Sequence, residues 1–255
     1  MDPAAISGPN PHPLLGGVVG VDFSPKKVCS FDCIYCGVGM NTTKKTMERE
    51  MFHPVGDVLE AIARHVEEHG TPDTFFLTGS GEPMLYSAFG EMATALKEAY
   101  PDVALTVYTN GSLLDDPDVR REIALCDPIQ GNLDTVDERT LVRLSRPHPE
   151  ALLRDRVEGY RTLKGELVGQ QLWLHGVFID GAADDPNELH SLGEAVASID
   201  PDLYVVRTTQ RRIDGLCEPV GASFRAVVEE AWREFDFPVR YFLPQPEDHS
   251  RGDRE

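Results

Sequence analysis

The sequence predicts an α/β fold with a parallel sheet, arranged as a partial (β/α)6 barrel in a single domain, and three observations lead to it. Apolar runs of strand length alternate with stretches in which apolar residues recur every three to four positions. The chain has 255 residues, a length at which α/β barrels form one unit. We find no internal repeat or linker that divides it. Repeated strand–helix units connect by right-handed crossovers and build a parallel sheet.

The expected elements follow from these two periodicities. Seven apolar segments are expected as strands: 17–23, 73–79, 103–109, 128–134, 172–180, 202–208 and 238–242. Four amphipathic stretches are expected as helices: 55–66, 85–96, 185–199 and 224–235. The third helix opens with a capping pattern, in which Asp185 caps, Pro186 fits the first turn and Glu188 can reach back. We expect the domain over 14–243, after a loose, proline-rich N-terminal extension (1–13) and before a polar C-terminal tail (244–255).

Composition restricts the class of protein and its partners. No apolar run approaches eighteen residues, and the N-terminus lacks the basic-then-apolar layout of a secretory signal, so we expect a cytoplasmic protein without a membrane span. Acidic residues outnumber basic ones by 43 to 24, for a net charge of −19, which disfavours nucleic acid as the main partner. Adaptation to a salty cytoplasm would also explain this charge. Residues 44–50 and 207–213 are candidate basic patches.

Three of the five cysteines lie in a C-x-x-x-C-x-x-C array of Cys29, Cys33 and Cys36, after the first expected strand. In a reducing compartment such a group indicates metal binding rather than disulfides. Three thiolates can hold three irons of a [4Fe–4S] cube and leave the fourth iron free for a small molecule with an amine and a carboxylate. The alternatives are a zinc site completed by His53 and ordinary buried cysteines.

Other informative segments also follow expected strands, where α/β sheets carry their chemistry. "GSGEP" (79–83) follows the second strand and "TNGS" (109–112) the third. "NLD" (132–134) closes the fourth strand, and "RTTQRR" (207–212) ends the sixth.

The cysteine array, with Tyr35 just before its last cysteine, resembles the signature of the radical S-adenosylmethionine (SAM) enzymes. With "GSGEP", "YTNGS", "NLDT", "SRPHPE" and "VEGY" in this order, the resemblance extends over roughly residues 14–215 and points to the wyosine-synthase-like branch. It implies a TIM-type barrel, a [4Fe–4S] cluster, SAM and a low-potential electron donor of the ferredoxin or flavodoxin type. It also implies reductive cleavage of SAM to methionine and a 5′-deoxyadenosyl radical, which abstracts a hydrogen atom from the substrate.

The resemblance also assigns roles to residues. Cys29, Cys33 and Cys36 become the catalytic cluster ligands, and the expected cofactor-binding residues are Tyr35, Gly79, Ser80, Gly81, Glu82, Asn110, Asn132, Asp134 and His175. Within this set, Glu82 accepts from the methionine amine, while Asn132, where the family usually has serine, and Asp134 hold the ribose. Each of these segments also has an alternative, purely structural interpretation: a strand-to-helix turn at 79–83, a turn at Asn110 and a helix cap at 132–134.

Further residues are considered for the substrate. His175 lines the cavity if its strand face points inward, and is otherwise a core residue. Arg207 and Arg211 are expected to bind a carboxylate or phosphate, or else are solvated loop charges. Cys217 can approach the cavity, whereas Cys126 is expected to be a buried structural thiol.

Three functions therefore compete. The favoured one is a radical enzyme acting on a small molecule, a cofactor precursor or a polypeptide side chain. The second is a tRNA modifier, although residues 1–28 lack the added cysteines of that branch, and "PHPLLG" stands where the branch commonly has a serine–arginine–arginine run. The third is a non-catalytic iron–sulfur or zinc protein.

Overall fold

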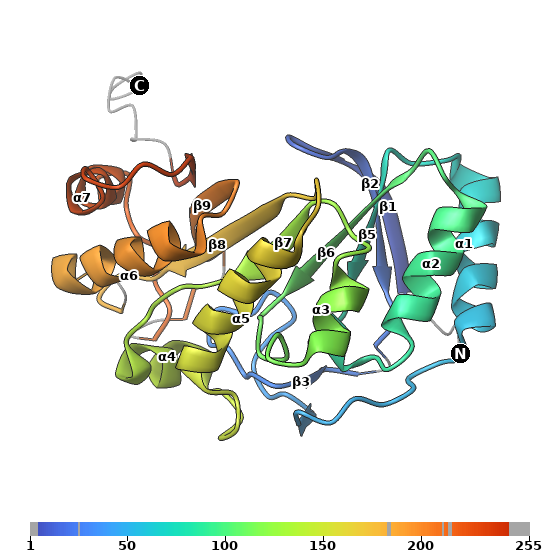
Figure 1. The fold of residues 1–255 in the computed structure, drawn as a ribbon, viewed down its shortest axis with the longest axis horizontal. Coiled ribbons are helices and arrows are strands. Elements are labelled where there is room, and N and C mark those ends of the chain that lie inside the picture. Colours follow the sequence, from blue (N-terminus) through green and yellow to red (C-terminus); the bar gives the residue numbers. More distant parts are fainter. Residues whose placement is uncertain (1–4, 25, 183–184, 211, 214–215, 245–255) are drawn as a thin grey trace, which may run out of the picture.

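The computed structural model describes residues 5–24, 26–182, 185–210, 212–213 and 216–244. These form one α/β domain around a mostly parallel sheet with helices packed along its outer side (Figure 1). Within the described ranges, no helix combines the length and the apolar character that crossing a bilayer requires. The expected fold class is confirmed.

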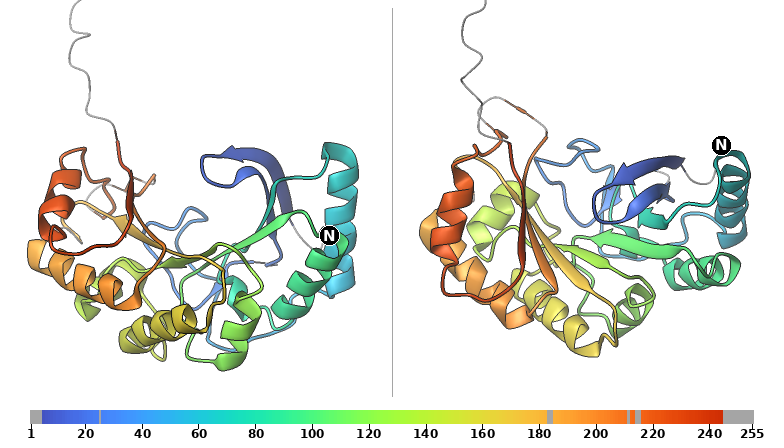
Figure 2. Two further views of the ribbon diagram at one scale, coloured as in Figure 1. Left: turned by 45° about the horizontal axis from the view of Figure 1, so that its top comes forward. Right: turned by 90° about the horizontal axis from the view of Figure 1, so that it is seen from above.

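The central sheet has eight strands in the order β1-β2-β5-β6-β7-β8-β9-β10, so neighbours in the chain are neighbours in space. The strands are β1 (Ala5–His12), β2 (Gly16–Asp22), β5 (Thr74–Thr78), β6 (Ala104–Thr109), β7 (Ile129–Asn132), β8 (Leu172–Phe178), β9 (Leu203–Thr208) and β10 (Val239–Phe242). All pairs are parallel except β1 with β2. The sheet curves into an arc that is open between its two edges, β1 and β10 (Figure 2). All seven expected strands are confirmed.

Helices connect successive strands and cover the convex side of the arc. They are α1 (Val55–His69), α2 (Phe89–Ala99), α3 (Pro117–Ile123), α4 (Glu138–Ser145), α5 (Leu153–Glu166), α6 (Pro186–Ile199) and α7 (Phe224–Ala231), with a 3-10 turn η1 (Pro83–Leu85). The cap of α6 forms in part as expected, since Asp185 accepts from the amides of Asn187 and Glu188 at 2.9 and 3.2 Å. Glu188 does not reach back, because its carboxylate accepts from the Thr140 hydroxyl.

The N-terminal segment differs from the expected loose extension. Residues Ala5–His12 form β1, which pairs antiparallel with β2 and has a register shift between Ser7 and Asn10. Two prolines are tolerated here because β1 is an edge strand, where missing amide donors leave no partner unsatisfied. The domain therefore includes this strand, while the expected tail from 245 onward lies outside the described residues.

The central strand β8 shows how the sheet separates core from cavity. Its seven residues are all buried. Leu174 and Phe178 join the main apolar core, whereas Trp173, His175 and Val177 line hollow spaces within the arc. Alternate residues of a strand point to opposite faces, and of the two alternatives left open for His175, the structure has the one in which it lines the cavity.

Candidate functional site

The three cysteines lie at the carboxyl end of the parallel strands, on a loop tied to its surroundings. Cys29 ends the two-residue strand β3 (Val28–Cys29), which pairs with β4 (Lys44–Lys45). The amides of Asp32 and Ile34 donate to carbonyls of Ser145 and Leu144 at 2.9 Å each. These bonds fix the loop against the end of α4.

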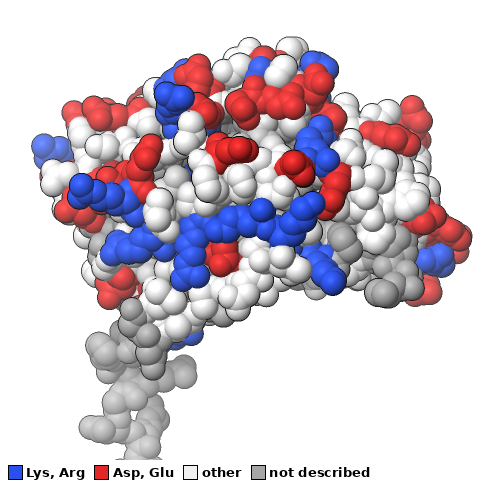
Figure 3. Space-filling model, turned by 90° about the horizontal axis from the view of Figure 1, so that it is seen from below, with Lys and Arg blue, Asp and Glu red and all other residues white. Residues whose placement is uncertain are grey.

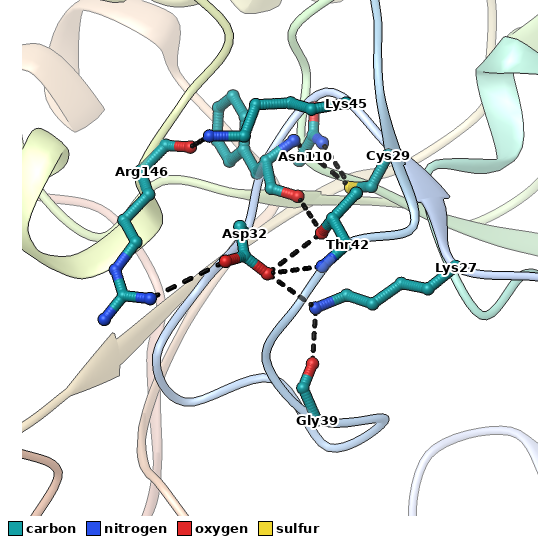
Figure 4. A network of polar contacts seen from close by, with 9 residues as sticks. Lys27, Cys29, Asp32, Gly39, Thr42, Lys45, Asn110 and Arg146 are labelled. Carbon is teal, nitrogen blue, oxygen red and sulfur yellow. Dashed lines mark hydrogen bonds and ion pairs between the residues drawn. The ribbon is translucent and has the colours of Figure 1, made fainter.

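Asp32 organises the inside of this loop (Figure 4). Its Oδ1 accepts from the Thr42 amide at 2.8 Å, the Thr42 hydroxyl at 3.0 Å and Lys27 Nζ at 3.3 Å, and its Oδ2 lies 3.6 Å from the Arg146 guanidinium. Burial opposes its charge, but the hydrogen bonds from Thr42 and Lys27 outweigh burial and lower its pKa to about 2. Asp32 is therefore an anionic anchor that joins both ends of the cysteine loop.

The loop opens on a pocket of about 210 Å³. Its walls include Cys29, Cys33, Tyr35, Cys36, Gly81, Glu82, Tyr108, Asn110, Asn132, Val177 and Arg207. The structure thus brings together the three cysteines and most of the residues expected around them, from four different strand ends.

The donor set suits a thiolate-bound cluster. Burial raises the pKa of the Cys29 thiol above its usual range and that of Cys33 to about 12. These sulfurs are poor anions by themselves but are deprotonated when they coordinate a metal. In the described part of the chain, no three His, Cys, Asp or Glu side chains converge on one point as the ligands of a single metal ion do. The cysteines of a cube each bind a different iron and need not converge on one point.

Glu82 braces the floor of the pocket. Only 2% of the residue is exposed, and its carboxylate accepts from the Thr109 hydroxyl at 2.7 Å and from the amides of Asn110 and Met84 at 2.7 and 3.1 Å. Burial raises its pKa despite these bonds. Glu82 joins the ends of β5 and β6, so most of its accepting capacity is used within the protein.

The two glycines of "GSGEP" have close neighbours, a backbone carbonyl for Gly81 and a side-chain hydroxyl for Gly79. A Cβ on Gly81 would lie 1.6 Å from the Val28 carbonyl oxygen, and one on Gly79 would lie 2.5 Å from the Ser24 hydroxyl. The Glu82 amide also donates to the Val28 carbonyl, at 3.0 Å. Gly81 thereby lets the cysteine-bearing strand pack directly on the end of β5. Ser80 donates its amide to Asp22 at 2.9 Å.

Asp134, one of the two expected ribose residues, contacts Tyr35, another of the expected cofactor-binding residues. The Tyr35 hydroxyl donates to the Asp134 carboxylate, and Asp134 also accepts from the amide of Val177 at 2.7 Å and the side-chain amide of Asn132 at 2.8 Å. Burial raises the pKa of Asp134. Asn132 and Tyr35 line the pocket, while Asp134 lies behind them.

Asn110 ties the third strand end to the cysteine loop. Its side-chain amide donates to the Ser30 hydroxyl at 2.8 Å and lies 3.7 Å from the Cys29 sulfur (Figure 4). Its oxygen accepts from the Ser112 amide at 2.9 Å, which is the turn expected for this segment. Asn110 therefore forms a turn and also contacts a proposed cluster ligand.

Sequence reasoning missed two residues of α5 that support the site from behind. Arg156, 1% exposed, donates to the carbonyls of Asn110 and Asn132 at 3.0 and 2.7 Å and lies over the Phe31 ring. Tyr160, one turn later, donates to the Asn132 carbonyl at 3.2 Å. A Cβ on Gly131 would lie 2.4 Å from the Tyr160 ring. The sequence signals for this contact were a glycine within a buried strand and the motif "VEGY" (157–160), which contains Tyr160 but was given no role.

A second, larger cavity of about 740 Å³ adjoins the cysteine pocket within the arc. Tyr108 and Arg207 line both spaces, while His175 and Trp173 line only the larger one. His175 therefore faces the cavity rather than the cysteines.

The two cysteines outside the array do not line the larger cavity. Cys217 is buried, with its sulfur 3.6 Å from the Thr209 hydroxyl, and does not line the cavity. Cys126 is fully buried before β7. Arg211 lies outside the described residues.

Basic side chains gather on the face below the sheet, where the cysteine loop lies (Figure 3). The cysteine loop and its two short strands carry three exposed lysines, Lys26, Lys44 and Lys45. Lys45 pairs with Cys29 across the β3–β4 ladder and donates to the Arg146 carbonyl at 2.9 Å. This row of positive charge contrasts with the chain's net charge of −19.

Comparisons with known proteins agree with this geometry. Residues 23–185 match the family model described as the Radical SAM superfamily. A UPF0026 protein of Methanocaldococcus jannaschii is 31% identical over 176 residues, which cover 67% of this chain and 54% of that protein. The chain thus spans only about half the length of that relative.

Two solved structures share the fold. A radical SAM methyltransferase from Sphaerobacter thermophilus has a TM-score of 0.65 at 18% identity, covering 91% of this chain and 68% of that one. TYW1 with a lysine–pyruvate adduct bound has a TM-score of 0.64 at 16% identity, covering 86% and 74%. At these identities the likeness concerns the fold.

Proposed function

We propose, from the premise that this chain belongs to the radical SAM superfamily, that it is an enzyme that binds a [4Fe–4S] cluster through Cys29, Cys33 and Cys36 together with SAM. Membership of the superfamily implies both cofactors. When bound, the reduced cluster would supply one electron to SAM, which would cleave it to methionine and a 5′-deoxyadenosyl radical that abstracts a hydrogen atom from the substrate. The substrate occupies the larger cavity.

The observation that carries this proposal is the common wall between the two spaces. Tyr108 and Arg207 line both the pocket of the cysteines and the larger cavity. A molecule held in the cavity would therefore lie beside a cofactor held at the cysteines. Such proximity is what a short-lived reactive group requires of its target.

The chain's own residues would hold and orient SAM. Asn132 and the Asp134 carboxylate offer acceptors to a diol, provided that the Tyr35 hydroxyl gives up its bond to Asp134. Glu82 keeps a remaining lone pair for an ammonium group but acts mainly by fixing the amide of Asn110.

Anaerobic reconstitution with iron and sulfide tests this proposal. The wild type should gain the broad visible absorbance of a cluster and release 5′-deoxyadenosine from SAM under dithionite. Cys33→Ala should lose both, whereas Cys126→Ala, which removes a buried thiol far from the loop, should keep both. Release of 5′-deoxyadenosine by Cys33→Ala would contradict the ligand assignment, and a cluster without any SAM cleavage would favour a non-catalytic iron–sulfur protein.

The basic face supports a proposal for the electron donor, an acidic protein of the ferredoxin or flavodoxin type. An exposed lysine, Lys45, lies one strand away from Cys29, so a donor docked there would be close to the cluster. Lys45→Glu should slow reduction by such a donor several-fold at low salt but leave reduction by dithionite unchanged. Lys97→Glu, on α2, is the control. Equal slowing in both variants would reject docking at this face.

A nucleic acid is the competing occupant of the same face. The wyosine-synthase-like branch assignment belongs to this second proposal, which the basic row in Figure 3 favours and the net charge opposes. Binding of tRNA that weakens steeply with salt and is lost in Lys45→Glu would support it. Absence of tRNA binding at modest salt would remove it.

A further inference from the structure

The lining of the larger cavity differs in charge from the rest of the protein. Acidic residues exceed basic ones by 43 to 24 in the chain, yet none of the described side chains that line this cavity is an Asp or a Glu. Two arginines and two histidines do line it: Arg207, Arg212, His12 and His175. The described lining of the cavity therefore carries no negative side chain, although the chain as a whole has a net charge of −19.

Arg207 is the cation closest to the cysteine pocket. It is partly buried, and within the described chain no salt bridge joins it to a carboxylate. Its Nη2 donates to the Tyr108 hydroxyl at 3.0 Å, and its guanidinium lies 5.2 Å from the Tyr108 ring centroid. A guanidinium has five N–H donors in a fork that matches carboxylate or phosphate. Arg212, by contrast, is exposed and paired with Glu218 at 3.0 Å.

His175 gives a second, independent indication of a ligand. The residue is only 6% exposed, and both of its ring nitrogens are buried without a hydrogen-bond partner. Its ring stands edge-on to Tyr108, with centroids 5.2 Å apart. Burial, and next the charge of Arg207, lower its pKa well below the usual value, so the ring is neutral and offers one donor and one acceptor. A buried polar group without a partner is costly, so a ligand that bonds to it gains affinity.

We propose that the larger cavity is the site of a small substrate that carries a carboxylate or phosphate next to a planar ring. Arg207 binds the anionic group, His175 bonds to a polar atom of the ring system, and Trp173 and Tyr108 flank the ring. The volume of about 740 Å³ lies within the range of small-molecule sites. The inference rests on the proposed function in treating this cavity as the substrate site.

Calorimetry on the full-length, anaerobically reconstituted protein tests the anion selectivity with three probes that share a phenyl ring. Phenyl phosphate and phenylacetate carry the two candidate anions, and 2-phenylethanol is their neutral counterpart. We expect at least one anionic probe to bind ten or more times as tightly as the neutral one, and the tighter of the two identifies the anion. Arg207→Gln should weaken that binding at least tenfold and leave the neutral probe unaffected, with Arg207→Lys between them.

Arg212→Gln is the matched control, because it removes an arginine that also lines the cavity but is already paired. It should change affinity less than threefold. The inference is overturned if neither anion binds at millimolar concentration, if the neutral probe binds as tightly, or if Arg207→Gln and Arg212→Gln act equally. If Arg207→Gln does not fold, the affinities of the wild-type protein for the anionic and the neutral probes still test the inference.

This test separates the inference from the proposed function. Probe binding does not require SAM cleavage, and SAM cleavage does not require anion selectivity. If the protein cleaves SAM but does not prefer the anionic probes, only the proposed substrate class is rejected. If the protein prefers the anionic probes but forms no cluster, only the proposed radical chemistry is rejected.

Discussion

The cysteine pocket and the larger cavity share a wall but differ in how their polar groups are used. Around the pocket, Glu82 and Asn110 in its wall and Asp32 within the cysteine loop each make several hydrogen bonds to the protein. In the cavity, His175 has two buried nitrogens without partners, and Arg207 makes one described hydrogen bond. The first region is preorganised by the chain itself, whereas the second has binding capacity that a ligand would use. Polar substitutions should therefore cost stability in the first region and little in the second.

The largest loss of stability is expected at Gly81, where the backbone after β5 packs on the backbone of β3. Gly81→Ala would place a methyl group 1.6 Å from the Val28 carbonyl oxygen, which cannot be accommodated without moving the cysteine strand. We expect a loss of more than about 4 kcal/mol in the free energy of unfolding, measured by urea denaturation, or failure to fold. Gly37→Ala is the control in the same region, because its Cβ would meet nothing within 4 Å. Similar stability of both variants would contradict the packing described.

The next effect concerns the support behind the pocket. Arg156→Met leaves the carbonyls of Asn110 and Asn132 without their charged donor, so we expect a loss of about 3 kcal/mol in unfolding free energy. Arg154→Met, on the same helix but with an 81% exposed side chain, should be nearly neutral. Urea denaturation of both variants measures the difference, and equal values would show that Arg156 does not brace the strand ends.

A smaller, pH-dependent effect is expected at Asp32. Its folded pKa of about 2 lies below the ordinary value of 3.8, so its charge contributes stability above about pH 4, and this contribution is lost as the pH falls toward 2. Asp32→Asn should cost about 1 to 2 kcal/mol near pH 7. The difference from wild type, followed by urea denaturation across this pH range, should shrink on acidification. A constant difference would argue against an ionised anchor.

The smallest effect is expected in the cavity. His175→Phe replaces a neutral ring without hydrogen-bond partners by an apolar ring of similar size, so stability should change by less than about 1 kcal/mol and can rise. Thermal and urea denaturation without ligand measure this. A loss above about 2 kcal/mol would erase the contrast between the two regions.

The sequence predicted the sheet well because its inner strands, such as the fully buried β8, read as continuous apolar runs. It missed β1 because "AISGPNPH" carries two prolines, and proline is acceptable at an edge that the sequence alone does not identify. His12, which lines the larger cavity, was missed for the same reason.

The site was predicted to the extent that local motifs encode it. The cysteine array and the strand-end segments located most of the pocket, because parallel strands bring their carboxyl ends together. The motif "VEGY" includes Tyr160, but Arg156 and Tyr160 act on a strand end 24 and 28 positions away in the sequence, and the motif does not reveal that contact. Likewise, the lack of partners around His175 follows from three-dimensional packing and not from its strand position.

The open arc of the sheet has a mechanical consequence for ligand entry. His12 of β1 and Phe242 of β10 line opposite margins of the larger cavity, and the described ladders do not join these two strands. A closed barrel has a fixed circumference, because widening it would break hydrogen bonds between its strands. Here no described ladder joins the two edges, so an outward bend at β10 would widen the opening without breaking a ladder bond, and the same scaffold would then admit ligands of different width.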